Sequence, residues 1–144
     1  MNYNYNSKKA VVVLSSTIES SIALNVTGHL CISLGANIDD TELMGQKEIY
    51  DKSDKKHIGI SRYPVITTKL KPSKLKTFIQ NVKENYQDIF IVDYPLEMLE
   101  TGHDEELVEA LKNINNEDII YYGALIYGDT EIINQLTGKF SLWR

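Results

Sequence analysis

Residues 8–15 read "KKAVVVLS", a continuous apolar run that follows two charged residues and ends at a serine. Strands covered on both faces have this composition, because neither face needs polar side chains. The stretch therefore predicts a strand at the centre of a sheet, with other elements packed on both of its sides.

A helix is expected next, over residues 17–34. Ser16 and Glu19 have the spacing of a capping box, and Gly35 is a suitable C-terminal stop. The polar stretch 36–62 that follows predicts a long surface excursion, with one short turn or strand near "ELMGQKEIY".

Beyond this excursion the pattern alternates between strands and helices. Apolar and β-branched runs predict three more strands, and apolar residues at helical spacing predict three more helices. Together they predict an α/β fold, a three-layer α/β/α sandwich on a mixed central sheet of about four strands, formed as a single domain over residues 1–144. The expected strands are 63–70, 88–94 and 118–128, and the expected helices are 72–86, 103–114 and 129–138.

The composition favours a globular protein in a reducing compartment. The chain has 144 residues, of which 42% are hydrophobic, and its one cysteine, Cys31, has no disulfide partner within the chain. No apolar run reaches the roughly 18 residues that a membrane-spanning helix needs, and the polar start "MNYNYNSKK" lacks the apolar core of a signal sequence. We therefore expect a cytoplasmic protein without membrane contact.

Charge is unevenly distributed along the chain. The net charge of −5 argues against a protein devoted to nucleic acid, which needs a cationic surface. Residues 52–76 nevertheless carry eight basic side chains against one acid, whereas residues 93–131 carry eleven acids against one lysine. The basic region is either a solvated face or a local site for a phosphate or carboxylate. RNA binding there would depend on Lys69, Lys71 and Lys74.

Four stretches of the chain read "ALNVTGHL", "GISRYPVI", "VDYPLEMLETGHD" and "LTGKFSLWR". In these stretches the chain resembles the uncharacterised bacterial family called domain of unknown function two thousand. Their order and spacing extend the resemblance over nearly the whole chain. That family is similar in fold to the archaeal and eukaryotic (type two) peptidyl-tRNA hydrolase, which cleaves the ester between peptide and tRNA. The resemblance therefore implies a hydrolase-like fold.

Taken residue by residue, the hydrolase resemblance implies catalytic roles for His29 and Asp93. His29 matches a histidine of the first helix, and Asp93 matches an aspartate at the end of the third strand. The lysine that the hydrolase presents near the start of its first helix falls at Ile22, and residues 10–46 contain no lysine. Two function classes follow: a binding protein on a hydrolase-like scaffold, or a hydrolase of an ester or amide bond.

The first expected helix also carries a polar seam. Ser21, Asn25 and His29 are spaced by four residues and share one stripe of the helix. These side chains either hydrogen-bond to backbone carbonyls at the sheet edge, or face a ligand cleft and meet Asp93. In the second case His29 would transfer protons, Asp93 would orient it, and Asn25 would bind the ligand.

A second polar cluster precedes the acidic helix. Thr101 and His103 belong either to the helix start, capped by Thr101 or Asp104, or to a ligand site. His29, His103 and Asp93 amount to three metal-ligating side chains, but no two of them have the tight spacing of a zinc site. We therefore expect no metal and no cofactor.

Two further candidates flank the basic region. Arg62 is either solvated or binds a carboxylate or phosphate through its planar guanidinium, and Tyr63 either packs or lines the same site. The preferred function is binding of a small anionic ligand or protein partner in a cleft near the first helix, with nucleic acid disfavoured.

The last residues of the chain, "KFSLWR", are unusually apolar for a terminus. Phe140, Leu142 and Trp143 would be costly to leave in water. We expect them to dock on the body of the protein, and a homodimer contact is the alternative.

Overall fold

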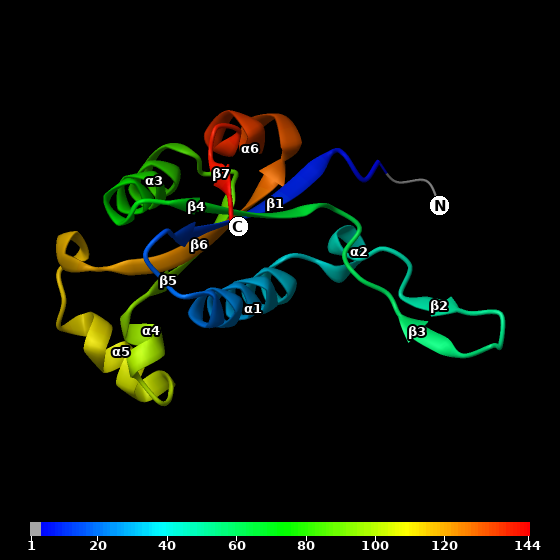
Figure 1. Ribbon diagram of the computed structural model, residues 1–144, viewed down its shortest axis with the longest axis horizontal. Helices are drawn as coiled ribbons and strands as arrows, with labels where there is room; N and C mark the ends of the chain where they lie inside the picture. Colours follow the sequence, from blue (N-terminus) through cyan, green and yellow to red (C-terminus); the bar gives the residue numbers. More distant parts are fainter. Residues whose placement is uncertain (1–3) are drawn as a thin grey trace.

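A computed structural model describes residues 4–144. The first three residues of the predicted domain and of the polar N-terminal segment lie outside the described residues. The described chain forms a mixed five-stranded sheet, six α-helices and a separate two-stranded hairpin (Figure 1). The elements are β1 (Lys8–Ser15), α1 (Ser20–Asn37), α2 (Asp40–Leu43), β2 (Glu48–Tyr50), β3 (Lys56–Ile58), β4 (Val65–Leu70), α3 (Pro72–Asn85), β5 (Phe90–Pro95), α4 (Glu97–Glu100), α5 (Asp104–Lys112), β6 (Tyr121–Asp129), α6 (Thr130–Thr137) and β7 (Ser141–Leu142).

β1 is the central strand, as its apolar sequence predicts. The strand order is β5-β6-β1-β4-β7, and β1 runs parallel to β4 and antiparallel to β6. Alternate side chains of β1 enter two different cores. Ala10, Val12 and Leu14 pack in the core that includes α1, whereas Val11 and Val13 pack in the core that includes α3 and α6.

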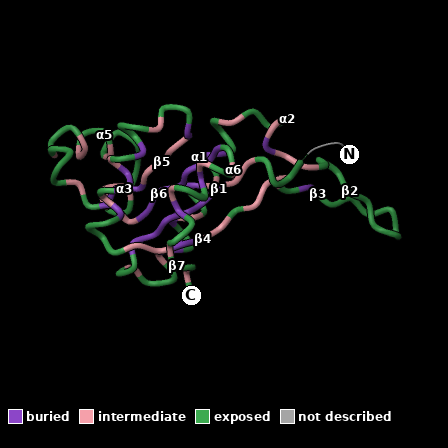
Figure 2. Tube along the Cα trace, turned by 90° about the horizontal axis from the view of Figure 1, so that it is seen from above, coloured by how far each residue is buried: buried purple, intermediate pink, exposed green. Residues whose placement is uncertain are grey.

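Helices cover both faces of the five-stranded sheet. α1 lies on one side of the sheet and α3 and α6 lie on the other (Figure 1). Figure 2 shows buried residues both in the strands of the sheet and on the helices that cover it, whereas the β2–β3 hairpin is exposed along its length. The hydrophobic cores therefore lie against both faces of the five-stranded sheet.

The sheet has one strand more than expected, because the apolar terminus adds β7 to its edge. β7 pairs antiparallel with β4, and the Trp143 backbone N–H donates to the Thr67 carbonyl at 2.9 Å. The Phe140 ring meets the Phe78 ring of α3 edge-on, with 5.3 Å between the ring centroids. The end of the chain therefore docks on the body as predicted, with Phe140 and Trp143 packed against the cores, whereas the Leu142 side chain stays exposed.

Two elements begin later than the sequence predicts. The backbone N–H of Ser16 donates to the Leu70 carbonyl at 2.8 Å, which holds Ser16 at the end of the sheet. α1 therefore begins beyond Ser16, with Glu19 at its N-cap and no capping hydrogen bond from a side chain, so the predicted capping box was wrong. The helix also continues past Gly35. β6 begins later than expected because residues 116–118 form a short 3-10 helix.

The polar segment 36–62 is more structured than the single turn or strand expected. It forms α2 and the β2–β3 hairpin, which projects away from the sheet as an arm (Figure 1). The Arg62 guanidinium donates to the Met44 carbonyl at 2.8 Å and to the Thr41 carbonyl at 3.0 Å. These bonds tie the end of the arm to its beginning.

A polar network anchors this arm to the sheet. The Glu42 carboxylate of α2 accepts from the Lys8 ammonium at 2.7 Å and from the Tyr127 hydroxyl at 3.0 Å. The bond to Lys8 lowers the pKa of Glu42 and raises the pKa of Lys8, and burial followed by the bond to Glu42 raises the pKa of Tyr127. All three groups therefore keep the protonation states that the network needs at neutral pH.

The acidic segment after β5 forms two helices, α4 and α5, where one helix was expected. His103 occupies the N-cap of α5, and its Nδ1 accepts from the Glu106 backbone N–H at 3.5 Å. Thr101 does not cap α5, because its hydroxyl donates to the Glu97 carbonyl at 2.7 Å, and Asp104 is already the first residue of the helix. The predicted capping by Thr101 or Asp104 was therefore wrong.

Gly123 and Gly28 offer a matched test of the core packing. A Cβ at Gly123 in β6 would lie 3.0 Å from Leu14 and 3.1 Å from Val26, whereas a Cβ at Gly28 on α1 would meet open space. We expect Gly123→Ala to lower the free energy of unfolding by about 1–3 kcal/mol through overpacking. Gly28→Ala should raise it by up to about 1 kcal/mol, because alanine favours helix. Chemical denaturation measures both changes, and a Gly123→Ala protein as stable as the wild type would contradict this packing.

Candidate functional site

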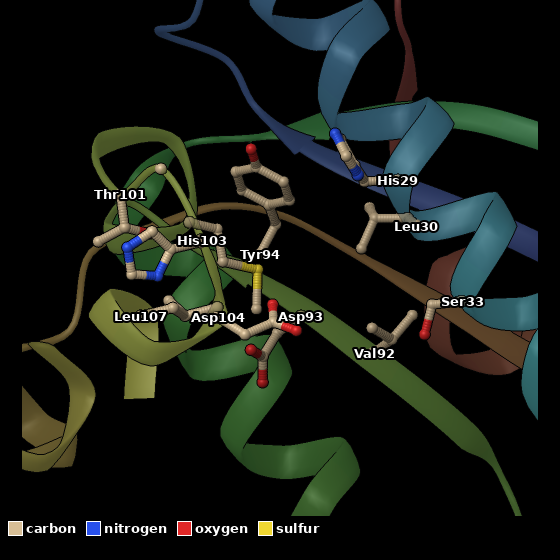
Figure 3. Close-up of a pocket in the computed structure, with 12 residues that line it drawn as sticks. His29, Leu30, Ser33, Val92, Asp93, Tyr94, Thr101, His103, Asp104 and Leu107 are labelled. Atoms are coloured by element: carbon tan, nitrogen blue, oxygen red, sulfur yellow. The ribbon is translucent and has the colours of Figure 1, made fainter. Parts of the chain in front are cut away.

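A cavity of about 450 Å³ opens between α1, β5 and the α4–α5 segment. We call it the His cavity, after the two histidines that line it (Figure 3). Four of the residues singled out in the sequence meet here, although they come from three separate parts of the chain. The lining residues are His29, Leu30, Ser33, Val92, Asp93, Tyr94, Met98, Thr101, Gly102, His103, Asp104 and Leu107.

The cavity lies at the edge of the sheet because β5 is an edge strand. Successive residues of a strand point to opposite faces of the sheet. Val92 and Tyr94 accordingly pack on the α1 side, whereas Asp93 pairs with Lys83 of α3 on the other side. The cavity therefore joins groups from both faces around the exposed edge of β5.

Tyr94 links the polar seam of α1 to the cavity. Its ring centroid lies 6.1 Å from that of His29, and its hydroxyl donates to the Asn25 Oδ1 at 3.4 Å. Burial raises the pKa of Tyr94, which keeps its hydroxyl protonated and able to donate. Asn25 therefore contributes to the cavity through Tyr94 rather than by lining it, and its side chain donates to no backbone carbonyl of residues 4–144.

His29 and Asp93 do not form the pair that the sequence suggests. In Figure 3 the His29 ring lies beside α1 in the upper part of the view, with the Tyr94 ring to its side, and the Asp93 carboxylate lies lower. The Asp93 side chain is only 16% exposed and its carboxylate is bound by the Lys83 ammonium. Among the hydrogen bonds of residues 4–144, none joins His29 to Asp93. His29 is instead an exposed side chain whose ring lies near the Tyr94 ring.

The loop before α5 forms the wall opposite α1. The Gly102 backbone N–H donates to the Glu106 carboxylate at 2.9 Å, and the His103 Nε2 lies 3.2 Å from the other oxygen of that carboxylate. Glu106 therefore fixes the position of His103. Asp104 follows at the start of α5 and adds a second carboxylate to the lining.

Arg62 and Tyr63 lie apart from the His cavity. The Arg62 guanidinium donates hydrogen bonds to the Met44 and Thr41 carbonyls of the projecting arm. Tyr63 lines a separate apolar cavity of about 220 Å³ together with Cys31, whose pKa is raised by burial. The structure thus brings His29, Asp93, Thr101 and His103 together, but it does not bring Arg62 or Tyr63 to them.

No group of three or more His, Cys, Asp and Glu side chains within residues 4–144 is placed to hold a metal ion. None of the helices in this part of the chain is both long and apolar enough to cross a membrane.

Sequence reasoning missed three residues that shape the site. Tyr94 stood in the quoted motif "VDYPLEM" without a role, and the alternation of a strand would have placed it opposite Asp93. Asp104 was considered only as a helix cap. Lys83 was read as part of an amphipathic helix, and no local pattern indicates that it meets Asp93.

Comparison with known proteins identifies the family. Residues 8–144 match the family model described as protein of unknown function (DUF2000). The chain belongs to this family. A solved structure of a protein of unknown function from Agrobacterium tumefaciens strain C58 resembles this DUF2000 chain with a TM-score of 0.82 and 22% identity, over 96% of this chain and 98% of that chain. This likeness shows the fold alone, and no curated protein matches the chain.

The Lys83–Asp93 pair can be tested by a double-mutant cycle. Lys83→Met leaves a largely buried carboxylate without its partner, so we expect the free energy of unfolding to fall by about 1 kcal/mol, since the lysine is itself half-exposed. Adding Asp93→Asn to Lys83→Met should recover part of this loss, because the uncompensated charge is removed. Urea denaturation of the wild type, both single variants and the double variant gives the coupling energy. A coupling energy of zero would show that the pair does not form in solution.

Proposed function

We propose that this DUF2000 chain binds a small organic molecule in the His cavity. The observation that carries the proposal is the convergence of two imidazoles, a tyrosine hydroxyl and two carboxylates on one apolar-floored cavity of about 450 Å³. Small-molecule sites are typically concave, of roughly 300–1,000 Å³, and mostly apolar with a few placed polar groups. Leu30, Val92, Met98 and Leu107 supply the apolar part.

The charges around the cavity favour a ligand with a cationic or N–H donor group. Asp93 is neutralised by Lys83, whereas Asp104 has no ion pair within the described residues. No lysine or arginine belongs to the described lining. An anionic ligand, as expected from the sequence, would therefore find no lysine or arginine in this lining, whereas an ammonium group could approach Asp104 and the ring of Tyr94.

A titration with two ligands of equal size tests the proposal. We expect phenethylamine, a cation, to shift the backbone amide signals of His29, Tyr94 and His103 in two-dimensional NMR spectra. It should bind about tenfold more tightly than phenylacetate, a preference equivalent to one charge-assisted hydrogen bond. Asp104→Asn should remove most of this preference. Glu109→Gln makes the same charge change elsewhere on α5 and should leave the preference intact.

Three outcomes would contradict the proposal. The first is the absence of any shift at the cavity residues with either ligand. The second is tighter binding of phenylacetate. The third is an equal loss of preference in Asp104→Asn and Glu109→Gln, which would indicate general attraction to an acidic surface rather than a site.

Hydrolysis of an ester or amide bond is the second candidate, favoured by the presence of His29 and Asp93 on one cavity. Because Lys83 already occupies the Asp93 carboxylate, a catalytic pair would require that ion pair to open. A peptidyl-tRNA hydrolysis assay separates the candidates. A binding protein shows no turnover, whereas turnover that both His29→Ala and Asp93→Asn abolish would replace the binding proposal by the hydrolase.

The resemblance to type-two peptidyl-tRNA hydrolase contributes a broader set of predictions. We infer the hydrolase-like fold from this resemblance, and the three-layer sandwich from the alternation of strands and helices along the sequence. A cytoplasmic location and a homodimer stay predictions from the sequence.

A further inference from the structure

A second cavity, of about 490 Å³, lies at the carboxyl ends of β1 and β4. We call it the lysine cavity. It is separate from the His cavity and shares no lining residue with it. Its polar lining consists of Ser16, Lys69, Lys71, Lys74, Lys139 and Ser141.

We propose that the lysine cavity binds the phosphate group of a small phosphorylated molecule. Three segments that are distant in the sequence build it. β1 and β4 are parallel, so Ser16 and Lys71 follow strand ends that lie side by side at one edge of the sheet. β7 then pairs with β4 and brings Lys139 and Ser141 beside Lys69 (Figure 1).

The first support is the charge of the cavity. None of its four lysines takes part in an ion pair with a side chain of residues 4–144, and no carboxylate belongs to the described lining. Four ammonium groups on one cavity repel one another, even though the chain as a whole carries a net charge of −5. A multivalent anion would offset this repulsion, because it can accept hydrogen bonds from several ammonium groups at once.

The second support is the beginning of α3, which adjoins the same cavity. Lys71 is the N-cap of this helix, the first turn holds no acidic residue, and the N-cap offers no side-chain hydrogen bond to the free backbone N–H groups. Lysines at the positive end of a helix dipole are unfavourable, and acids are the usual choice there. Lys71 and Lys74 are therefore unfavourably placed, and an anion in the cavity would offset this by attracting both lysines and the beginning of the helix.

Phosphate fits this lining better than a carboxylate does. A phosphate carries up to two negative charges and several acceptor oxygens, which matches four ammonium groups and two hydroxyls. The cavity is also larger than a phosphate ion, and Leu70 and Phe140 give it an apolar wall for an organic part. The expected ligand is thus a small phosphate ester, with the phosphate toward the lysines and the organic part toward Phe140.

The experiment uses the full chain and phenyl phosphate as the probe. We expect calorimetric titration to show binding at moderate ionic strength and NMR signals of Ser16 and Ser141 to shift. Inorganic phosphate should bind more weakly, because it lacks the part that contacts Phe140, and benzoate should bind most weakly. An inorganic phosphate that binds as tightly as phenyl phosphate would overturn the ester and indicate a site for the free ion.

Matched charge variants show where the probe binds. Lys74→Gln/Lys139→Gln removes two lysines of the cavity and should weaken phenyl phosphate binding by about tenfold or more. Lys52→Gln/Lys55→Gln removes two lysines at the tip of the exposed hairpin, and should leave binding within about twofold because only distant screened charges change. Lys74→Arg/Lys139→Arg keeps the charges and should retain binding. Circular dichroism verifies that each variant is folded.

Two results would overturn the site. One is equal weakening in both glutamine double variants, which indicates a general charge effect. The other is no binding of phenyl phosphate together with tight, steeply salt-dependent binding of a short single-stranded RNA, which indicates a nucleic-acid surface. The inference is independent of the His cavity, and the lysine variants should leave phenethylamine binding unchanged.

Discussion

The structure depends on the burial of β1 on both of its faces. Val12 and Val13 are adjacent in sequence and fully buried, yet they enter different cores. A shift of β1 by one residue against its neighbours would exchange the two sets of side chains and bring Ala10, Val12 and Leu14 to the core that now holds Val11 and Val13. Both helical coverings of the sheet are therefore fixed relative to each other by the register of one strand.

The two candidate sites lie where this buried centre ends. The sheet order places β5 at one edge and β7 at the other, with β1 in the middle. The His cavity surrounds the β5 edge, and the lysine cavity lies where β1, β4 and β7 end or begin. Polar side chains are tolerated at these positions because they keep access to water, whereas residues 10–14 of β1 are apolar and buried. The buried centre of the sheet therefore supports both candidate sites, and the polar side chains of these sites lie at its edges and strand ends.

The sequence predicts the interior better than the margins. The sequence correctly predicts the central strand, the amphipathic helix α3 and the docking of the apolar terminus. Burial requires apolar residues at many positions of an element, so it leaves a pattern that can be recognised in the sequence. The ends of the elements are predicted less well. Ser16 was assigned to a capping box, but a backbone hydrogen bond to Leu70 holds it at the sheet. Local spacing cannot reveal a bond between residues so far apart in sequence.

The long sequence separation of contacting residues also explains which parts of the candidate sites the sequence could predict. His29 and Asp93 could be singled out individually, but the ion pair between Asp93 and Lys83 depends on how α3 packs against β5.

The lysine cavity is the clearest case. Lys69, Lys71 and Lys74 stood out as part of a basic region, but Lys139 joins them only through β7, a strand of two residues. Such a strand leaves no readable pattern. The fold thus separates the charges of this protein. The acids that follow β5 lie at one edge of the sheet, and lysines from the middle and the end of the chain, without ion pairs within residues 4–144, lie near the other edge. One edge of the sheet presents acidic groups and the other presents lysines. Two ligands of opposite charge could therefore bind at the same time without competing for the same groups.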